Sequence, residues 1–443
     1  MYDTGTTAFM LFSTAVVLMM SPALALFYGG LSRRKNVLNT MAMTLLAMAV
    51  VGCSWILLGD SLAYGGADAY DENGNLVNLL GLFVGGGDRL LSSWSVDEVV
   101  AANQALGDGA TLAGSAWGQY PGALSVAFQA TFAMVTTAII SGSLAGRVKF
   151  GAWAFLVCVW PLLIYAPMAH MVWGGGLIGN PNAIGAIDFA GGTAVHICSG
   201  LSGLVLCVIL GARHGFRQMS YRPHNVPFVM LGGGLLFVGW FGFNGGSALV
   251  ADGNAALAIL NTVVAACAAA ACWAACEQKR IGKVTVVGLS TGFLAGLVVI
   301  TPACGFVEPW AAVVMGIIVS PICFACISTL KQKLGYDDAL DAFGCHGVGG
   351  MVGAVLTGVF CRPDLSWTDF GGLLYTGDPT LLIAQVLGVV VTVVFVGVGT
   401  AVLGLAAKAL FGNSLRVNRD AEVMGLDVVA NGEAAYPAFN GLD

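Results

Sequence analysis

Two stretches of the sequence each place an acid and an imidazole eight residues apart. The first runs from Asp188 to His196, and the second, about 150 residues later, from Asp338 to His346. The chain has only five histidines, so two of them in matching frames indicate a common role. Both frames enter long hydrophobic runs, where an ionisable side chain is costly enough to predict a functional site.

Two facing neutral imidazoles would supply a specific chemistry. Each ring has one N–H donor and one acceptor nitrogen. His196 and His346 can therefore share one N–H and turn their other nitrogens to a pore, which suits a small polar neutral molecule or a relayed proton. One buried histidine alone would be a core residue bonded to a carbonyl oxygen. A third interpretation is that the two histidines are haem ligands, which predicts visible absorbance of the purified protein.

The acids of the two frames have two interpretations. An acid before a helix start can accept hydrogen bonds from the free N–H groups of the first turn. It can also attract a cation or transfer a proton. We expect capping for Asp338 and Asp341, and leave both roles open for Asp188, which lies on the expected outer side.

Aromatic residues gather at the expected outer ends of several hydrophobic runs. Folding would bring these rings and one hydroxyl group into a vestibule suited to a small cation, because cation–π attraction is worth roughly 0.5–2 kcal/mol. An ordinary aromatic belt at the membrane interface is the alternative. The residues concerned are Phe128, Phe132, Trp173, Trp240, Phe243 and Ser247.

The composition predicts a membrane protein to hold these groups. Hydrophobic residues make up 57% and charged residues 9% of the 443 residues, and the mean hydropathy is +0.84. A soluble domain carries roughly 25% charged residues. The 63 glycines allow close helix packing in a membrane. The 12 cysteines are interpreted as small apolar side chains, and neither a metal site nor a cofactor is expected.

Apolar runs of about 20 residues predict eleven transmembrane helices in an all-α polytopic fold. The runs are Ala8–Tyr28, Leu38–Tyr64, Gly122–Ala145, Phe150–Trp173, Gly191–Ala212, Val226–Leu249, Ala255–Cys276, Val284–Cys304, Pro309–Leu330, Phe343–Cys361 and Thr380–Phe411. Of the 18 Lys and Arg residues, 16 fall in alternate loops, which predicts an outer N-terminus and a cytoplasmic C-terminus. Ala23-Leu24-Ala25 resembles a signal-peptide cleavage site, but without a basic leader we favour a retained first helix.

The repeated frames predict two inverted five-helix repeats. Phe27-Tyr-Gly-Gly ends the first run inward and Phe243-Asn-Gly-Gly ends the sixth outward, so the halves have opposite topology, as in transporters and channels. We place repeat one at about 8–212, repeat two at about 226–361 and an extra helix at about 380–411, packed across the outside. The transmembrane domain is then 1–411, and 412–443 is a cytoplasmic regulatory tail.

Six motifs together resemble the ammonium transporter, methylammonium permease and Rhesus family, in its bacterial ammonium transporter branch. They are Phe27-Tyr-Gly-Gly-Leu with Lys35-Asn-Val, Asp188-Phe-Ala-Gly-Gly-Thr-Ala-Val-His196, Pro223-His-Asn-Val-Pro227, Gly239-Trp-Phe-Gly-Phe-Asn-Gly-Gly-Ser247, Thr301-Pro-Ala-Cys-Gly305 and Phe343-Gly-Cys-His-Gly347. The resemblance implies a homotrimer in the cell (inner) membrane with one hydrophobic pore per subunit. It also implies that trimeric P-II nitrogen-signalling proteins bind the tail.

The resemblance also assigns roles to residues. It implies an outer ammonium recruitment site at Phe128, Phe132, Trp173 and Ser247, and a stacked gate of Phe132 and Phe243. It implies a twin-histidine pore at His196 and His346, with Asp188 as an acid needed for transport. Trp240, Asp338, Asp341 and Thr301 are expected to support this site.

The sequence departs from the family pattern at three positions. Gly146 replaces an acid after the third run, Asn431 stands where the tail usually has histidine, and Asp60 stands where an aromatic residue is usual. The first two bear on tail coupling to a P-II protein, and Asp60 has no assigned role.

We therefore expect a transporter of ammonium and methylammonium, not an enzyme or a nucleic-acid binder. It would deprotonate ammonium outside and conduct ammonia, with the proton crossing separately and producing a current. The alternatives are a passive ammonia gas channel and an ammonium sensor.

Overall fold

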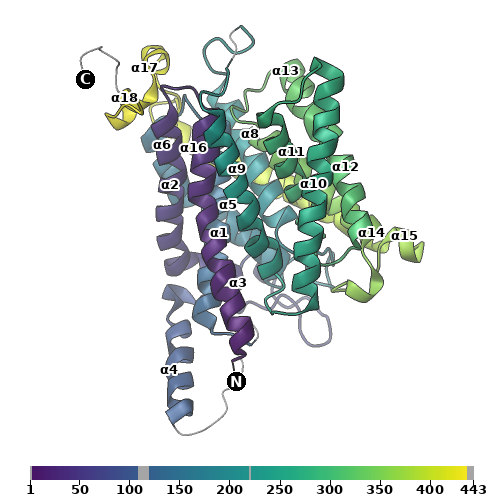
Figure 1. The fold of residues 1–443 in the computed structure, drawn as a ribbon. Coiled ribbons are helices and arrows are strands. Elements are labelled where there is room, and N and C mark those ends of the chain that lie inside the picture. Colours follow the sequence, from purple (N-terminus) through teal and green to yellow (C-terminus); the bar gives the residue numbers. More distant parts are fainter. Residues whose placement is uncertain (1, 108–118, 219–220, 437–443) are drawn as a thin grey trace.

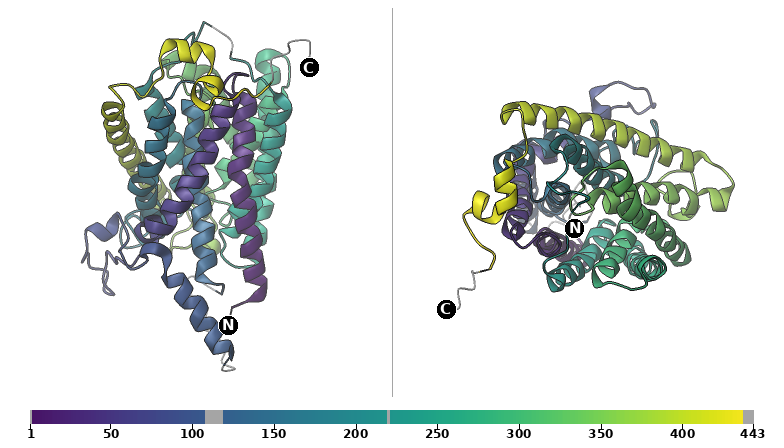
Figure 2. Two further views of the ribbon diagram at one scale, coloured as in Figure 1. Left: turned by 90° about the vertical axis from the view of Figure 1, so that its left-hand side faces the viewer. Right: turned by 90° about the horizontal axis from the view of Figure 1, so that it is seen from above.

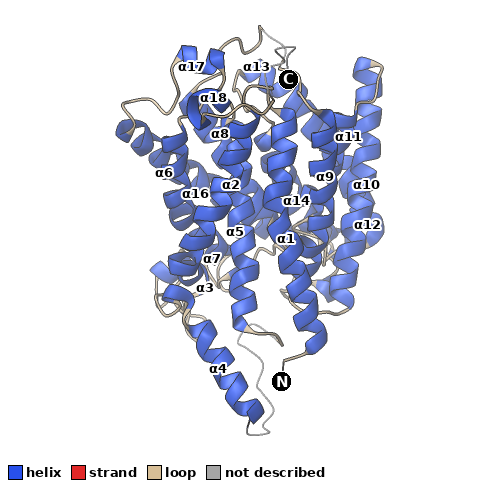
Figure 3. Ribbon diagram, turned by 60° about the vertical axis from the view of Figure 1, so that its left-hand side comes forward, coloured by secondary structure: helices blue, strands red, loops and turns tan. Residues whose placement is uncertain are grey.

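The computed structural model describes residues 2–107, 119–218 and 221–436, and its regular structure is helical (Figures 1 and 3). Two isolated β-bridges, Tyr70 with Leu76 and Val148 with Arg416, are the only β pairings among these residues. The all-α fold expected from the apolar runs is therefore confirmed.

The described residues include ten helical segments long and apolar enough to cross a membrane. Their bounds are Thr4–Leu31 (α1), Val37–Tyr64 (α2 to α3), Gly122–Leu144 (α5), Phe150–Trp173 (α6 to α7), Gly192–Leu210 (to α8), Val226–Gly245 (from α9), Gly253–Ile281 (α10), Pro309–Leu334 (α12 to α13), Phe343–Phe360 (to α14) and Thr380–Leu410 (α16). The expected eighth span is a shorter helix, α11 (Val286–Ile300), because tight turns begin at Thr301. Eleven predicted spans thus correspond to ten long helices and one short one.

Several helix ends follow local signals in the sequence. The Asp3 carboxylate accepts the Thr6 N–H at the start of α1, and the Asp252 carboxylate accepts the Ala255 N–H at the start of α10. The Thr285 hydroxyl does the same for α11. Gly282 ends α10 with φ of 71°, a left-handed conformation that glycine adopts without strain. These contacts satisfy backbone groups that a helix leaves unpaired at its ends.

The helices form one bundle with distinct ends. Helix α1 packs against α2, α5 and α9 at the surface of the bundle, with Leu11 and Phe12 exposed, and α16 runs along one side of the bundle (Figure 2). The N-terminus lies at one end, beside the projecting helix α4 (Trp94–Gly107). The tail helices α17 (Arg419–Met424) and α18 (Leu426–Asn431) lie at the other (Figure 1). The outward face of α16 exposes Val386, Val390 and Val394, as a lipid-facing helix should.

A buried ion cluster ties the loops together at the tail end of the bundle. Arg213 donates two hydrogen bonds to the Asp337 carboxylate, at 2.8 and 2.7 Å, and Arg147 lies 4.0 Å from it. Burial alone would raise the pKa of Asp337, but the hydrogen bonds and charges of the two arginines outweigh it and lower that pKa. Gly146 has φ of 80° beside this cluster, so glycine fits the backbone where the family pattern has an acid.

Candidate functional site

A cavity of about 160 Å³ opens at the N-terminal end of the bundle. It brings together the four residues expected to form a recruitment site and adds five that the sequence did not indicate. The lining residues are Tyr64, Phe128, Gln129, Phe132, Trp173, Phe189, Ser247, Leu249 and Trp367. We call this cavity the outer vestibule.

The expected vestibule residues are fixed by contacts within and between helices. Phe128 and Phe132 lie one turn apart on α5, with ring centroids 4.9 Å apart. The Trp173 indole N–H donates to the Asp188 carbonyl oxygen at 2.8 Å, which holds the ring at the end of α7. The Ser247 hydroxyl donates to the Phe243 carbonyl oxygen at 2.7 Å. Its oxygen lone pairs therefore remain as acceptors for a cationic N–H donor.

Gln129 adds a second acceptor to the outer vestibule. Its Oε1 atom is buried and has no hydrogen-bond partner in the described part of the chain. A buried acceptor without a donor costs about 1–3 kcal/mol, so an N–H-rich guest would be stabilised there. Gln129 could not be predicted as part of the site, because a glutamine beside Phe128 has no distinctive spacing. Trp367 was equally unmarked, since it comes from a loop and stacks on Phe189 only after folding, at 5.4 Å.

Two phenylalanine rings close the vestibule on its inner side. Phe132 and Phe243 stack at 4.1 Å between centroids with an angle of 18° between their planes. The next ring is that of His196, 5.7 Å from Phe243 and inclined by 24°. A nearly parallel series of rings therefore leads from the vestibule into the bundle.

His196 and His346 face each other below the phenylalanine pair. Their Nδ1 atoms lie 3.2 Å apart, and both side chains are buried. One Nδ1 must carry the proton and the other accept it, as expected for two neutral rings sharing one N–H. The Nε2 atom of His196 has no partner in the described residues. The cavity they line offers only about 10 Å³ to the centre of a water-sized molecule, room for one such guest.

The orientation of His196 is supported by a tryptophan and a threonine. The Trp240 ring stacks on the imidazole at 5.5 Å with an angle of 20°. The Trp240 indole N–H donates to the Thr301 hydroxyl at 3.0 Å, and that hydroxyl donates to the Leu297 carbonyl at 2.8 Å. Trp240 and Thr301 thus position the imidazole without facing the vestibule.

The three central side chains all lie on π-helical turns. His196 lies on η5 (Gly192–Ile197), Phe243 on η6 (Phe241–Gly245) and His346 on η8 (Phe343–Gly347). Single π turns within α-helices frequently occur at functional sites, because the extra residue changes the direction of the side chains. Apolar periodicity does not encode such a turn, so the sequence did not predict them.

The two acids of the repeated frames both cap the histidine-bearing helices. Asp188 accepts N–H groups from Gly191, Gly192, Thr193 and Ala194 at 2.7 to 3.2 Å. Its carboxylate is therefore committed to the start of η5. This contact favours the structural interpretation of Asp188.

The second frame is capped by one acid rather than two. Asp338 accepts the N–H groups of Ala342 and Phe343 at 3.2 and 2.8 Å. The expectation that Asp341 also caps this helix is wrong, because its carboxylate pairs with the Lys331 ammonium group. Asp341 has φ of 62°, which turns its side chain away from the helix start.

A further cavity continues the path toward the tail end. It measures about 60 Å³ and shares His346 and Leu294 with the histidine cavity. Phe27, Tyr28 and Asp341 line its far part. The vestibule, the phenylalanine pair, the histidines and this inner cavity thus lie in series through the bundle.

The remaining unusual residues have structural partners. Asp60 accepts the Trp94 indole N–H at 3.1 Å. Asn431 accepts the Asn39 side-chain N–H at 2.8 Å, so this departure from the family pattern takes part in holding the tail. His170 is buried, with its ring nitrogens 3.0 and 2.8 Å from the carbonyl oxygens of Ala63 and Gly81.

The chain is similar to known proteins in both sequence and fold. A sequence profile described as Ammonium Transporter Family matches residues 8–436. An ammonium transporter of Aquifex aeolicus is 46% identical over 98% of this chain and 94% of its own length. The crystal structure of Saccharomyces cerevisiae Mep2 has a TM-score of 0.80 and 31% identity, covering 95% of this chain and 88% of Mep2.

One further similar structure has a different description. A protein titled "Sensor Amt Protein" has a TM-score of 0.80 and 26% identity, covering 96% of this chain and 98% of its own. The fold is therefore shared by proteins described as transporters and by one described as a sensor.

Proposed function

The chain belongs to the Ammonium Transporter Family and is a multi-pass ammonium transporter rather than an enzyme, and we propose that it recruits ammonium, removes one proton and conducts ammonia. The observation that carries this proposal is the series formed by an aromatic vestibule, a stacked phenylalanine pair and a histidine cavity for one small molecule. The expected transport direction is from the N-terminal end to the tail end.

The outer vestibule suits ammonium rather than ammonia. The faces of Phe128, Phe132 and Trp173 attract a cation, and the oxygen atoms of Ser247 and Gln129 accept its N–H donors. An ion without N–H donors, such as potassium, would donate no hydrogen bond to these acceptors. We therefore assign recruitment to the outer vestibule.

The proton has to leave before the histidine cavity. A bare ion in a dry apolar medium costs tens of kcal/mol by Born solvation. Removing a proton at pH 7 from an amine with a pKa of about 9 costs only about 3 kcal/mol, at 1.36 kcal/mol per unit. Deprotonation is thus the cheaper route past Phe132 and Phe243. Ammonia then meets the unpartnered Nε2 of His196 as a hydrogen-bonding group.

We assign the proton to a separate relay through the histidine pair, so that net charge crosses the membrane. The Nδ1 contact of 3.2 Å between His196 and His346 supports this, since a shared N–H can pass from one ring to the other. Asp188 acts in the relay as a positioning residue, because its four N–H contacts fix the helix that carries His196. A gas channel would move ammonia without the relay.

We further propose that this pathway crosses the cell (inner) membrane. Residues 1–411 form the transport domain, in two inverted repeats and one extra helix, and residues 412–443 form a cytoplasmic tail. Three such chains assemble as a homotrimer within the lipid bilayer. A P-II nitrogen-signalling protein fits the tail end of the pathway, where Asn431 and its neighbours hold the tail against the bundle.

Similarity to the sensor protein suggests ammonium sensing as a second candidate function. A growth assay distinguishes transport from sensing. A host that lacks ammonium uptake should grow at low ammonium when it makes this protein, and should accumulate methylammonium. His346→Ala should abolish both while the protein remains in the membrane. A host that makes the protein but still fails to grow would favour the sensor role.

A further inference from the structure

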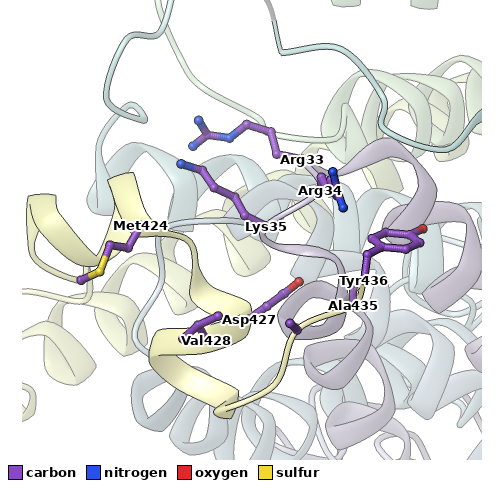
Figure 4. Close-up of a pocket in the computed structure, with 9 residues that line it drawn as sticks. Arg33, Arg34, Lys35, Met424, Asp427, Val428, Ala435 and Tyr436 are labelled. Carbon is purple, nitrogen blue, oxygen red and sulfur yellow. The ribbon is translucent and has the colours of Figure 1, made fainter. Parts of the chain in front are cut away.

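A separate cavity, which shares no lining residue with the three cavities of the proposed transport path, lies at the tail end of the bundle. It measures about 510 Å³ and lies between the loop after α1 and the tail (Figure 4). The loop contributes Arg33, Arg34 and Lys35, and the tail contributes Asp427 and Tyr436 among others. We call it the tail cavity. Its volume falls within the range of about 300–1,000 Å³ typical of small-molecule sites.

The tail cavity carries excess positive charge. Three consecutive cations line it, and Asp427 is the one acid among its lining residues. The Asp427 carboxylate accepts the N–H groups of Val37 and Asn39, at 3.0 and 2.9 Å, so it caps α2 (Val37–Ser54). It makes no salt bridge with the cations within the described part of the chain. The cations therefore remain available to an anion from outside.

The neighbouring positive charges of the loop also repel one another. Burial, and next the charge of Arg33, lower the pKa of Lys35. The Lys35 ammonium group donates to the Val423 carbonyl oxygen, and the Arg34 guanidinium lies over the Tyr436 ring, 5.3 Å from its centroid. A bound anion would relieve this repulsion.

Hydrogen bonds and close packing between the loop and the tail hold the walls of the tail cavity in place. The Leu426 N–H donates to the Asn36 side-chain oxygen at 2.9 Å, and the Asp427 N–H donates to the Lys35 carbonyl at 3.2 Å. Gly425 lies so close to Lys35 that a Cβ atom there would be 2.6 Å from its backbone oxygen. The Tyr436 hydroxyl lies 3.0 Å from Nε2 of His224. The tail is thus held at both ends of the cavity.

We propose that the tail cavity binds a phosphate-bearing ligand and thereby holds the tail against the loop. Guanidinium groups match phosphate oxygens with paired hydrogen bonds, and Lys35 adds a point charge. The same chemistry is offered by the headgroup of an anionic phospholipid, because the loop joins two membrane helices, and by a free phosphate compound. A ligand between loop and tail would stabilise residues 424–436. This inference does not depend on the proposed transport mechanism.

The test uses the full chain in phosphatidylcholine nanodiscs, with two probes. Inorganic pyrophosphate is titrated calorimetrically, and in a separate arm phosphatidylglycerol replaces half of the lipid. Hydrogen exchange of residues 424–436 is followed in both arms. We expect at least one probe to slow the exchange. The probe that does so identifies the ligand as a lipid headgroup or as a free phosphate compound. The double variant Arg33→Gln with Arg34→Gln should bind that probe about tenfold more weakly or worse, as expected for lost charge-assisted contacts.

Matched controls keep the result specific. Lys279→Gln with Lys283→Gln removes two exposed cations from the same end of the bundle and should leave both readouts unchanged. His346→Ala should bind the probe like the unaltered protein, which separates this site from the transport path. The proposal is overturned if neither probe slows exchange, or if the two double variants behave alike.

Discussion

At the scale of single residues, the molecule uses each ionisable group for one task. His196 and His346 face each other, and the Trp240 ring stacks on the His196 imidazole. Asp188 and Asp338 make no hydrogen bond to the imidazoles and instead accept N–H groups of the helices that carry them. In the proposed mechanism the chemistry therefore rests on the two imidazoles, and the carboxylates of Asp188 and Asp338 fix the helices that carry them.

Asp188 offers a test of this division. Asp188→Asn keeps one acceptor oxygen, whereas Asp188→Ala leaves four buried N–H groups without an acceptor. Each buried donor left unsatisfied costs about 1–3 kcal/mol. We expect thermal unfolding in detergent to show Ala less stable than Asn, and Asn less stable than the unaltered chain. Methylammonium uptake should fall in the same order.

The matched site in the second repeat provides the control. Each oxygen of Asp338 accepts one N–H group, whereas each oxygen of Asp188 accepts two, so Asp338→Asn should destabilise the protein less than Asp188→Asn. If Asp188→Asn unfolded like the unaltered chain and yet lost all uptake, the carboxylate would act directly on the transported species.

At the scale of elements, the pore depends on a close approach of two helices. Helix α8 (Cys198–Leu210) follows the π turn of His196, and α14 (Val348–Phe360) follows that of His346. A Cβ atom on Gly200 would lie 2.3 Å from the backbone nitrogen of Gly347. Only glycine at position 200 allows this packing, which brings the two imidazoles into contact.

Gly200→Ala should therefore separate the histidines. The added methyl group has to displace the backbone of η8, at a cost of about 1–3 kcal/mol for overpacking. Methylammonium uptake should fall on the order of tenfold, since small misplacements of reacting groups have large effects. Gly234→Ala is the control, because a Cβ there meets nothing within 4 Å. Equal uptake by the two variants would show that the contact between the histidines is not needed.

The sequence predicted the helices and most of the site, but not how the helices are bent. Hydrophobic runs mark membrane helices directly, and the matching frames of His196 and His346 indicated a pair. The π turns depend on tertiary packing, so periodicity does not reveal them. Gln129 and Trp367 enter the vestibule only through folding, and Asp341 was misassigned because Lys331 competes for its carboxylate.

At the scale of the whole molecule, one bundle separates two kinds of site. The transport path that we propose narrows from a vestibule of about 160 Å³ to a histidine cavity of about 10 Å³, so hydrated ions would be excluded by size and bare ions by desolvation. The cationic tail cavity lies apart from it, at the end where the tail is held. The proposed transport path and the proposed phosphate site can therefore be altered separately.

We propose that ammonium is split into ammonia and a proton and that both cross the membrane. Electrical recording from the purified protein on supported membranes tests it most directly. Ammonium and methylammonium should each evoke a current, potassium should evoke none, and His346→Ala should lose the ammonium current. Ammonia uptake without any ammonium-dependent current, or an equal current with potassium, would contradict the claim.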